Sequence, residues 1–401
     1  MNHLDQSPAG THEKTVPSAP SLGSLFLTFL KIGSTAFGGF MALISVVQNY
    51  AVVRRKLIEE EDMLDGISLA TILPGPVAVN VVAYVGYRVR GVAGAVVCAV
   101  AVLLPSFLLL LGLSYAYFRF DQVPAVEKFF MGFIPAVAAI IAAASWNMGK
   151  KAITGMVEML ITLAAFGLLL GIGGFVVTLG IISGSGIIGL LAFRQSSGPP
   201  SQPKKERLTG ARLNSAAAAM VAVPFLSMDL ALAGKLFVTF AGMSVLLFGG
   251  GYVFIPLIQE IVVTGHGWVT QQEFIDGIAL GQVTPGPILI SAAFFGYKVA
   301  GLLGAASATI GIYTPPALIM LLSARFLDRI KRSPAIKASL RGIRAGVIGM
   351  IAAAAVVVAL TAQPNWVSLA VFAAALIALL RFKIEVAWII PVAGIAGLLL
   401  Y

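Results

Sequence analysis

Two Pro-Gly-Pro triplets interrupt strongly apolar segments of the chain. The first triplet is Pro74-Gly75-Pro76 and the second triplet is Pro285-Gly286-Pro287, 211 positions later (285 − 74). Proline cannot continue a helix from its N-terminal side, and glycine tolerates the dihedral angles of a break. A new half-helix can start after each triplet, and its N-terminus, with unpaired N–H groups and partial positive charge, binds anions. The alternative is a packing kink, but recurrence at one offset favours a pair of anion-binding helix ends.

Polar side chains accompany both triplets. Thr71 and Asn80 flank the first triplet, and Gln282 and Ser291 stand at the equivalent places around the second, again 211 positions apart (282 − 71). Thr284 adds a hydroxyl group directly before the second triplet. Neutral donors of this kind suit an anion that must be released again after it has bound.

Ionisable residues inside apolar segments cost energy and are functional candidates. Asp65 and Asp276 open the two triplet-containing segments, where each carboxylate is either a helix N-cap or a proton-coupling group. Arg88 and Lys298 end the same segments, where they guide an anion or anchor the chain at the lipid headgroups. Lys31 lies deep in the first apolar segment without a charged counterpart in the second half, and it serves the site or snorkels to the interface.

A second pair of breaks precedes the triplets. Phe37-Gly38-Gly39 recurs as Phe248-Gly249-Gly250, also 211 positions later (248 − 37). Consecutive glycines let a helix unwind or let two helices approach closely, and these two interpretations are compatible. Interrupted helices at matching positions of two membrane halves indicate a transport site, so both motifs join the predicted substrate site.

The composition predicts an all-α membrane protein. Of 401 residues, 59% are hydrophobic and 11% are charged, and the mean hydropathy is +0.96, so the bilayer is the expected solvent. The net charge of +10 lies in short loops between apolar runs, which is the positive-inside pattern and not a nucleic-acid-binding face. With one cysteine, three histidines and no nucleophile–base pair, the sequence predicts no disulfide, metal site, cofactor or enzymatic activity.

The chain divides into a disordered tail at 1–20, a first membrane repeat at 21–193, a basic cytoplasmic linker at 194–214 and a second membrane repeat at 215–401. The apolar stretch 215–228 has no counterpart in the first half and is read as a re-entrant or interfacial piece.

Charge in the loops predicts that the two repeats have opposite orientations. The loop at 54–56 is basic, whereas its counterpart at 263–275 contains no lysine or arginine, and the bias reverses between 119–128 and 325–337. If the triplet-containing segments are hairpins that enter and leave on one side, each half has about five full spans, or about ten in total. The N-terminus is then external, and it moves inside if the first segment is also a hairpin, broken at Gly38-Gly39.

The motifs resemble those of the chromate ion transporter family. The resemblance covers both halves from Leu22 onward, and it is closest in the second half, through Glu273-Phe274, Gly281-Gln282, the second triplet and Gly296-Tyr297-Lys298. The first half is more divergent, with Phe40, Leu43, Leu57 and Thr71 at positions where the family often has other residues. The resemblance implies export of chromate, a tetrahedral dianion much like sulfate, across the inner membrane.

The sequence therefore predicts a multi-pass inner (plasma) membrane transporter with an inverted repeat, which exports an oxyanion by alternating access at the paired triplets. Lipid and chromate or a similar oxyanion are the expected partners, and a homodimer is compatible with the chain. Transport of sulfate or another anion is one alternative, and a non-transporting membrane scaffold or sensor is another. Uniport and antiport with protons or sulfate fit the sequence equally well.

Overall fold

The structure is a computed structural model that describes residues 20–35, 39–120, 123–194, 230–248, 251–326, 333–361 and 365–400. Every regular element in these ranges is a helix, as expected for an all-α membrane protein. The tail, nearly all of the linker and the stretch 215–228 lie outside the described residues, as do Phe37, Gly38, Gly249 and Gly250.

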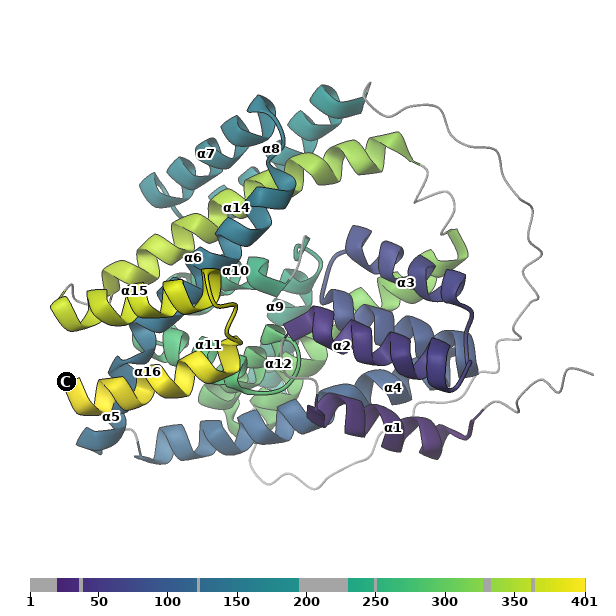
Figure 1. The fold of residues 1–401 in the computed structure, drawn as a ribbon, viewed down its shortest axis with the longest axis horizontal. Coiled ribbons are helices and arrows are strands. Elements are labelled where there is room, and N and C mark those ends of the chain that lie inside the picture. The colour runs from purple at the N-terminus through teal and green to yellow at the C-terminus, as the bar shows by residue number, and fades with distance from the viewer. Residues whose placement is uncertain are drawn as a thin grey trace, which may run out of the picture.

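The helices follow the same order in both halves (Figure 1). The first half contains α1 (Leu22–Thr35), α2 (Gly39–Gln48), the π-helix η1 (Asn49–Arg54), α3 (Glu60–Ile72), α4 (Val77–Phe120), α5 (Pro124–Met131), α6 (Phe133–Ala152), α7 (Met156–Gly171) and α8 (Phe175–Phe193). The second half contains α9 (Leu230–Ser244), η3 (Gly251–Val253), α10 (Phe254–Gln259), η4 (Glu260–Gly265), α11 (Gln271–Val283), η5 (Ile288–Ser291), α12 (Ala292–Ser323), η6 (Ala324–Phe326), α14 (Pro334–Thr361), α15 (Trp366–Leu380) and α16 (Val386–Leu400).

Within the residues that the structure describes, five stretches are long and apolar enough to cross a membrane, and six apolar helices of 10–17 residues accompany them. The five are Val77–Phe120, Pro124–Ala152, Phe175–Phe193, Ile288–Ser323 and Pro334–Leu360. These lengths fit a polytopic membrane protein, while the expected total of about ten spans stays a prediction.

The first apolar segment folds back on itself. The hydroxyl groups of Thr28 on α1 and Tyr50 on η1 lie 3.1 Å apart, and the rings of Phe29 and Tyr50 meet edge to face at 6.3 Å. These residues are equally far along the chain from the glycine break, so α1 and α2–η1 form two arms of a hairpin. Of the two arrangements left open for the first segment, a full span and a hairpin, the structure has the hairpin, because α1 and α2–η1 are separate short helices that contact each other.

The segments that contain the triplets are also hairpins, as expected. In the first half, Arg88 near the end of the returning arm pairs with Asp62 at 2.6 Å. In the second half, Lys298 pairs with Glu273, also at 2.6 Å. The arms approach closely at Gly66, where an added Cβ would overlap the ring of Tyr84.

Glycine is required at the tip of each hairpin. Gly75 has φ = 102° and Gly286 has φ = 110°, conformations that residues with a side chain rarely adopt. The residues directly before the two triplets, Leu73 and Thr284, have an extended backbone, with ψ = 156° and 146°. The two triplets therefore turn the backbone in the same way.

Neither α4 nor α12 is a single straight helix. Non-helical dihedral angles occur at Arg90 and Gly91 in α4, and at Ala300 and Gly301 in α12. At each place the chain turns sharply, and in α4 an added Cβ at Gly86 would overlap the carbonyl group of Gly94. The part of each helix before the turn is the returning arm of the hairpin, and the part after it, here named the long arm (residues 92–120 and 302–323), is the spanning helix.

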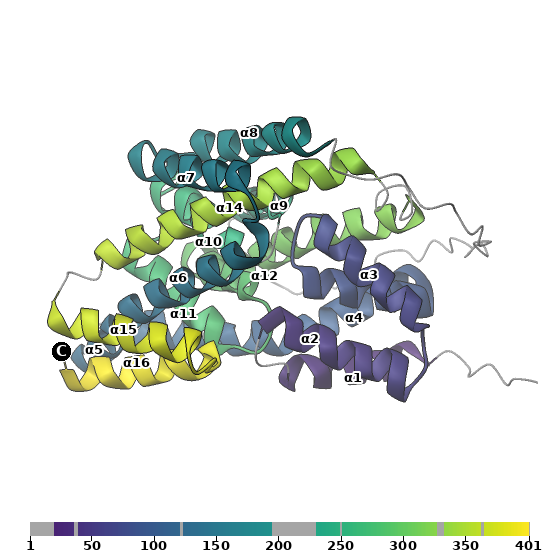
Figure 2. The ribbon, with the colours of Figure 1, turned by 45° about the horizontal axis from the view of Figure 1, so that its top comes forward.

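The last three helices of each half pack against the last three helices of the other half. Helix α14 of the second half packs along α6, α7 and α8, and α15 and α16 pack on α6. In both views α7 and α8 lie along one side of α14, and the first-half hairpins lie at the opposite end of the molecule from the C-terminus (Figures 1 and 2). One extended hydrophobic core joins the two halves.

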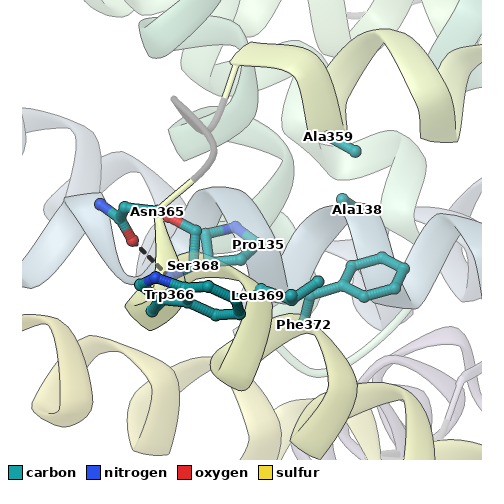
Figure 3. A pocket seen from close by; sticks show the side chains of 8 residues that line it. All are labelled: Pro135, Ala138, Ala359, Asn365, Trp366, Ser368, Leu369 and Phe372. Carbon is teal, nitrogen blue, oxygen red and sulfur yellow. Dashed lines mark hydrogen bonds between the residues drawn. The ribbon is translucent and has the colours of Figure 1, made fainter.

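Helices α6 and α14, which occupy equivalent places in the two halves, run antiparallel to each other. Ser145, late in α6, donates to the carbonyl group of Ile348 in the middle of α14, at 3.2 Å. Ala138, early in α6, shares a cavity with Ala359 near the end of α14 (Figure 3). Two equivalent helices that pack antiparallel are related by a rotation about an axis perpendicular to them.

Candidate functional site

The two triplets lie against the long arms of opposite halves. An added Cβ at Gly75 would overlap the ring of Pro316 in α12, and one at Gly286 would lie 2.9 Å from Oγ of Ser106 in α4. The Ser106 hydroxyl group also donates to the carbonyl oxygen of Pro285. Pro316 and Ser106 are 210 positions apart (316 − 106), so the contacts are reciprocal and bring both triplets to the centre of the molecule.

The first triplet is also tied to the Phe-Gly-Gly region of the second half. The backbone N–H of Gly75 donates to the carbonyl oxygen of Leu247, directly before Phe248, at 2.7 Å. Two of the predicted site motifs therefore meet in space although they are far apart in the sequence.

A small cavity of about 60 Å³ lies where these segments converge. It is larger than the roughly 10–15 Å³ that one buried water molecule needs. Its lining includes residues from both triplets and from the segment after Phe248-Gly249-Gly250, namely Pro76, Val77, Ala78, Gly251, Tyr252, Gln282, Gly286, Pro287, Ile288 and Leu289.

Buried polar atoms without a hydrogen-bond partner flank both triplets. Within the described residues these atoms are Oδ1 of Asn80, Nε2 of Gln282 and Oγ of Ser291, three of the predicted donors and acceptors. The other atom of the Asn80 amide, Nδ2, donates to the carbonyl oxygen of Pro74 at 3.2 Å. Because a buried unpaired polar group costs about 1–3 kcal/mol, these atoms favour a polar occupant.

The half-helix expected after each triplet is present, with a difference between the halves. Helix α4 begins directly after the first triplet, and the N–H of Asn80 donates to the carbonyl oxygen of Pro76. After the second triplet the chain makes the short 3₁₀ turn η5 before α12 begins at Ala292.

The two threonines are not available as donors in this arrangement. The hydroxyl group of Thr71 donates to the carbonyl oxygen of Ser68, and that of Thr284 donates to the carbonyl oxygen of Gly281, both at 2.8 Å. A threonine hydroxyl group has one hydrogen to donate, so only the lone pairs of these oxygens remain.

The predicted cations do not gather at the cavity. Arg88 and Lys298 form ion pairs between the arms of their own hairpins, which supports an anchoring role. Lys31 is exposed on α1 and does not line the cavity.

Neither aspartate is a helix cap. The N-cap residue of α11 is Thr270, which forms a capping box with Glu273, and the N-cap residue of α3 is Glu59. Asp276 lies within α11, where it is 1% exposed and accepts a hydrogen bond of 2.8 Å from the hydroxyl group of Tyr117 in α4. Asp65 lies within α3 and is half-buried.

Arg344 on α14 was not singled out by the sequence motifs. Its Nη2 lies 3.3 Å from the carbonyl oxygen of Thr71, three residues before the first triplet. The sequence does carry one signal for this residue, because Arg344 is an arginine in the apolar run that begins after position 342.

Other features of the structure fit a dianion less well. A cavity of about 500 Å³ between α6, α14 and α15 is lined mainly by apolar side chains, including Pro135, Trp366 and Phe372 (Figure 3). Among the residues that the structure describes, no cluster of histidine, cysteine, aspartate and glutamate could hold a metal ion.

Comparison with known proteins gives a consistent result. The family model described as "Chromate transporter" matches residues 23–193 and 234–398. A chromate transport protein of Cupriavidus metallidurans is 32% identical over 88% of this chain and 87% of its own length. The chromate transport protein of Pseudomonas aeruginosa is 31% identical over 97% of this chain and 94% of its own. An uncharacterized transporter of Methanocaldococcus jannaschii is 33% identical over 88% of each chain.

No solved structure matches this chain, so the fold rests on the coordinates described above. The family match extends over both halves and includes both triplets. Two chromate transport proteins align with nearly the full chain. The protein therefore belongs to the chromate transporter family.

Proposed function

We propose that the protein exports chromate across the inner membrane by alternating access at the paired triplets. The observation that carries the proposal is the small central cavity, which both triplets line in a chain of this family. The unpaired Nε2 of Gln282, which lines this cavity, supplies a hydrogen bond that replaces part of the hydration shell. Such replacement is needed because a bare dianion in hydrocarbon is prohibitively costly.

An inverted repeat is part of the proposal. Its support is the antiparallel packing of the equivalent helices α6 and α14. With the first segment folded as a hairpin, the basic loops at 54–56 and 150–151 share one side, those at 325–337 and 381–383 share one side, and the positive-inside rule makes both sides cytoplasmic. In each half, two hairpins then enter from one side, and the long arm and three further helices cross, so the inversion also requires one further crossing between α8 and α9.

The two halves differ in how far their triplet hairpins are covered, which supports alternating access. Helix α11 packs against α6 and α16, and Ile275 within it is 0% exposed. Helix α3 packs mainly on α4 and α12, and Leu64, equivalent to Ile275, is 51% exposed. We read this state as open toward the first-half hairpin and closed at the second, and thus as inward-facing.

The membrane potential is sufficient to drive export. An inside-negative potential of 100 mV favours outward movement by about 2.3 kcal/mol per negative charge, which is about 4.6 kcal/mol for a dianion. A uniporter therefore works without a coupling ion. Antiport with protons or sulfate remains equally compatible with the chain.

Uptake of radiolabelled chromate into inverted membrane vesicles tests the proposal. We expect saturable uptake that the Pro285→Ala/Pro287→Ala double variant loses. Pro391→Ala, which removes a proline from the interior of α16, is the matched control and should retain uptake at equal abundance in the membrane. Unchanged uptake in the double variant would refute the proposed site.

Sulfate is the second candidate substrate, because it is also a tetrahedral dianion. Competition by unlabelled sulfate during chromate uptake separates the two. Sulfate flux without chromate flux would assign the transporter to sulfate. Well-inserted protein without flux of either anion would support the scaffold or sensor alternative.

A further inference from the structure

We propose that Arg344 is the cation that receives the dianion on the cytoplasmic side of the cavity, before the triplets enclose it. This assignment rests on the proposed function, and it adds a charged, specificity-determining residue to a site otherwise made of neutral groups. A guanidinium group suits the role because its planar array of donors can bind two oxygens of a tetrahedral oxyanion at once.

The position of Arg344 connects α14 with the first triplet. It is ten residues into α14, about 15 Å along the helix axis, and its guanidinium group lies 3.3 Å from the carbonyl oxygen of Thr71 on α3. Helix α14 also packs on η3, whose Gly251 and Tyr252 line the cavity. The helix that carries Arg344 therefore contacts η3, which lines the cavity, and α3, which leads into the first triplet.

Arg344 lacks the carboxylate partner that its neighbours have. One turn earlier on the same helix, Nε of Arg341 donates to Oε1 of Glu158 at 2.6 Å. Within the described residues no carboxylate forms an ion pair with Arg344, and its hydrogen bond runs to a neutral carbonyl oxygen. A cation in an apolar helix without a counter-ion is costly, and a bound anion would remove that cost.

The guanidinium group is also accessible. Arg344 and Thr71 are both exposed, while Pro74, Gly75 and Pro76 directly beyond Thr71 are buried. An anion from the cytoplasm can therefore meet Arg344 before it reaches the cavity.

The first half has no equivalent charge. The position equivalent to Arg344 in the first half is Ile134 (344 − 210), which is buried in α6. The two mouths of the cavity thus differ, with a cation at one and an aliphatic side chain at the other. A cation on the capture side only raises affinity there and eases release on the other side, which suits an exporter.

A purely structural role is the competing explanation. An arginine near the C-terminus of α3 can stabilise the last carbonyl groups of that helix. This role requires no anion and predicts no change in substrate affinity. The two explanations differ in the Michaelis constant for chromate and in whether a bound anion protects this position from chemical modification.

The first experiment is chromate uptake by Arg344→Gln and Arg344→Lys in inverted vesicles. We expect Arg344→Gln to raise KM for chromate about tenfold or more while the maximal rate changes less, and Arg344→Lys to fall between it and the unmodified protein. Lys337→Gln, which removes an exposed cation from the same helix, is the matched control and should leave KM within about twofold. A KM for Arg344→Gln equal to that of the control would overturn the proposal.

A second experiment tests whether an anion binds at this position. Cys98 is the sole cysteine and is buried, so Arg344→Cys in a Cys98→Ala background carries a single thiol. We expect a cationic aminoethyl methanethiosulfonate reagent to restore uptake and the anionic sulfonatoethyl reagent not to restore it. We also expect sulfate to slow the modification of this thiol. Modification at the same rate with and without sulfate would support the structural role instead.

These outcomes separate this inference from the proposed function. Absence of flux from the Cys98→Ala parent would refute the transport proposal itself. Normal flux from the parent, with an unchanged KM in Arg344→Gln, would refute only the role of Arg344.

Discussion

Replacing the glycine at the tip of each triplet hairpin should destabilise the protein unequally. Gly75 and Gly286 both have positive φ angles, so alanine at either position carries backbone strain of about 1–3 kcal/mol. The surroundings differ, because the new methyl group would overlap the ring of Pro316 at Gly75 and would meet the hydroxyl group of Ser106 at Gly286.

The clash at Gly75 should add to the strain. A proline ring cannot rotate away, and overpacking in a close-packed interior costs about 1–3 kcal/mol. Gly75→Ala should therefore lower stability by about 2–6 kcal/mol, and Gly286→Ala by about 1–3 kcal/mol because the serine hydroxyl group can turn aside.

Two further glycines of α4 provide internal controls. Gly91 has φ = 64° with open space around an added Cβ, so Gly91→Ala should show strain without a clash. At Gly112 an added Cβ meets nothing within 4 Å in an ordinary helical conformation, and Gly112→Ala should be neutral or stabilising because alanine is the better helix former.

The assay is the thermal stability of the purified protein in detergent, measured as the fraction that stays monodisperse after heating. We expect stability to fall in the order Gly112→Ala, Gly91→Ala, Gly286→Ala, Gly75→Ala. If Gly75→Ala were as stable as Gly112→Ala, the tight tip and its contact with α12 would be refuted.

Three further substitutions test individual contacts by the same assay. Glu158→Gln removes the buried carboxylate, 1% exposed, that pairs with Arg341, and it should cost about 1–3 kcal/mol for the lost charge-assisted hydrogen bond, because the Arg341 side chain is 42% exposed and stays hydrated; stability equal to that of the parent would contradict this. Tyr117→Phe removes the hydroxyl donor to buried Asp276 and should cost about 1–3 kcal/mol, and no loss would show that Gln272 alone satisfies the carboxylate. Asp62→Asn removes a partly exposed ion pair and should cost at most about 1 kcal/mol, so a larger loss would indicate that this pair holds its hairpin together.

The sequence was sufficient to predict the triplet hairpins, because proline and glycine limit the backbone locally. Gly75 and Gly286 adopt the positive φ angles that such breaks require, and the Arg88–Asp62 and Lys298–Glu273 pairs close the two hairpins. The internal repeat also pointed to the residues that line the cavity, since Pro76 and Gln282 come from opposite halves and meet there.

The first hairpin could not be decided from the sequence. Hydropathy is equally high for one long span and for two shorter helices side by side. The contact between Thr28 and Tyr50 distinguishes these two arrangements, and it is a tertiary contact. The hydroxyl groups of Thr71 and Thr284 each donate to a backbone carbonyl group, a local contact that could have been foreseen, because threonine in a helix often bonds back to a carbonyl group of the preceding turn.

Contacts between distant segments set the remaining features. Arg344 approaches Thr71 across 273 positions of the chain, and no spacing rule links the two. The contact between the last helices of the two halves, in which α14 packs on α7 and α8, likewise depends on tertiary packing. A cation in an apolar run marks Arg344 as a candidate, but its place beside the first triplet required the structure.

The backbone of the two halves is nearly duplicated, whereas their packing is not. Gly91 and Gly301 turn with φ = 64° and 55°, and the triplets turn alike, yet α11 is covered by α6 and α16 while α3 lacks equally extensive cover from their counterparts α14 and α8. On the proposed mechanism, transport exchanges these two arrangements, so that α3 gains the contacts that α11 gives up. Because the surface buried at one hairpin offsets the surface exposed at the other, the two states can be close in free energy. The unequal charges at the two mouths, with Arg344 on one side only, then bias the direction in which the anion is captured and released.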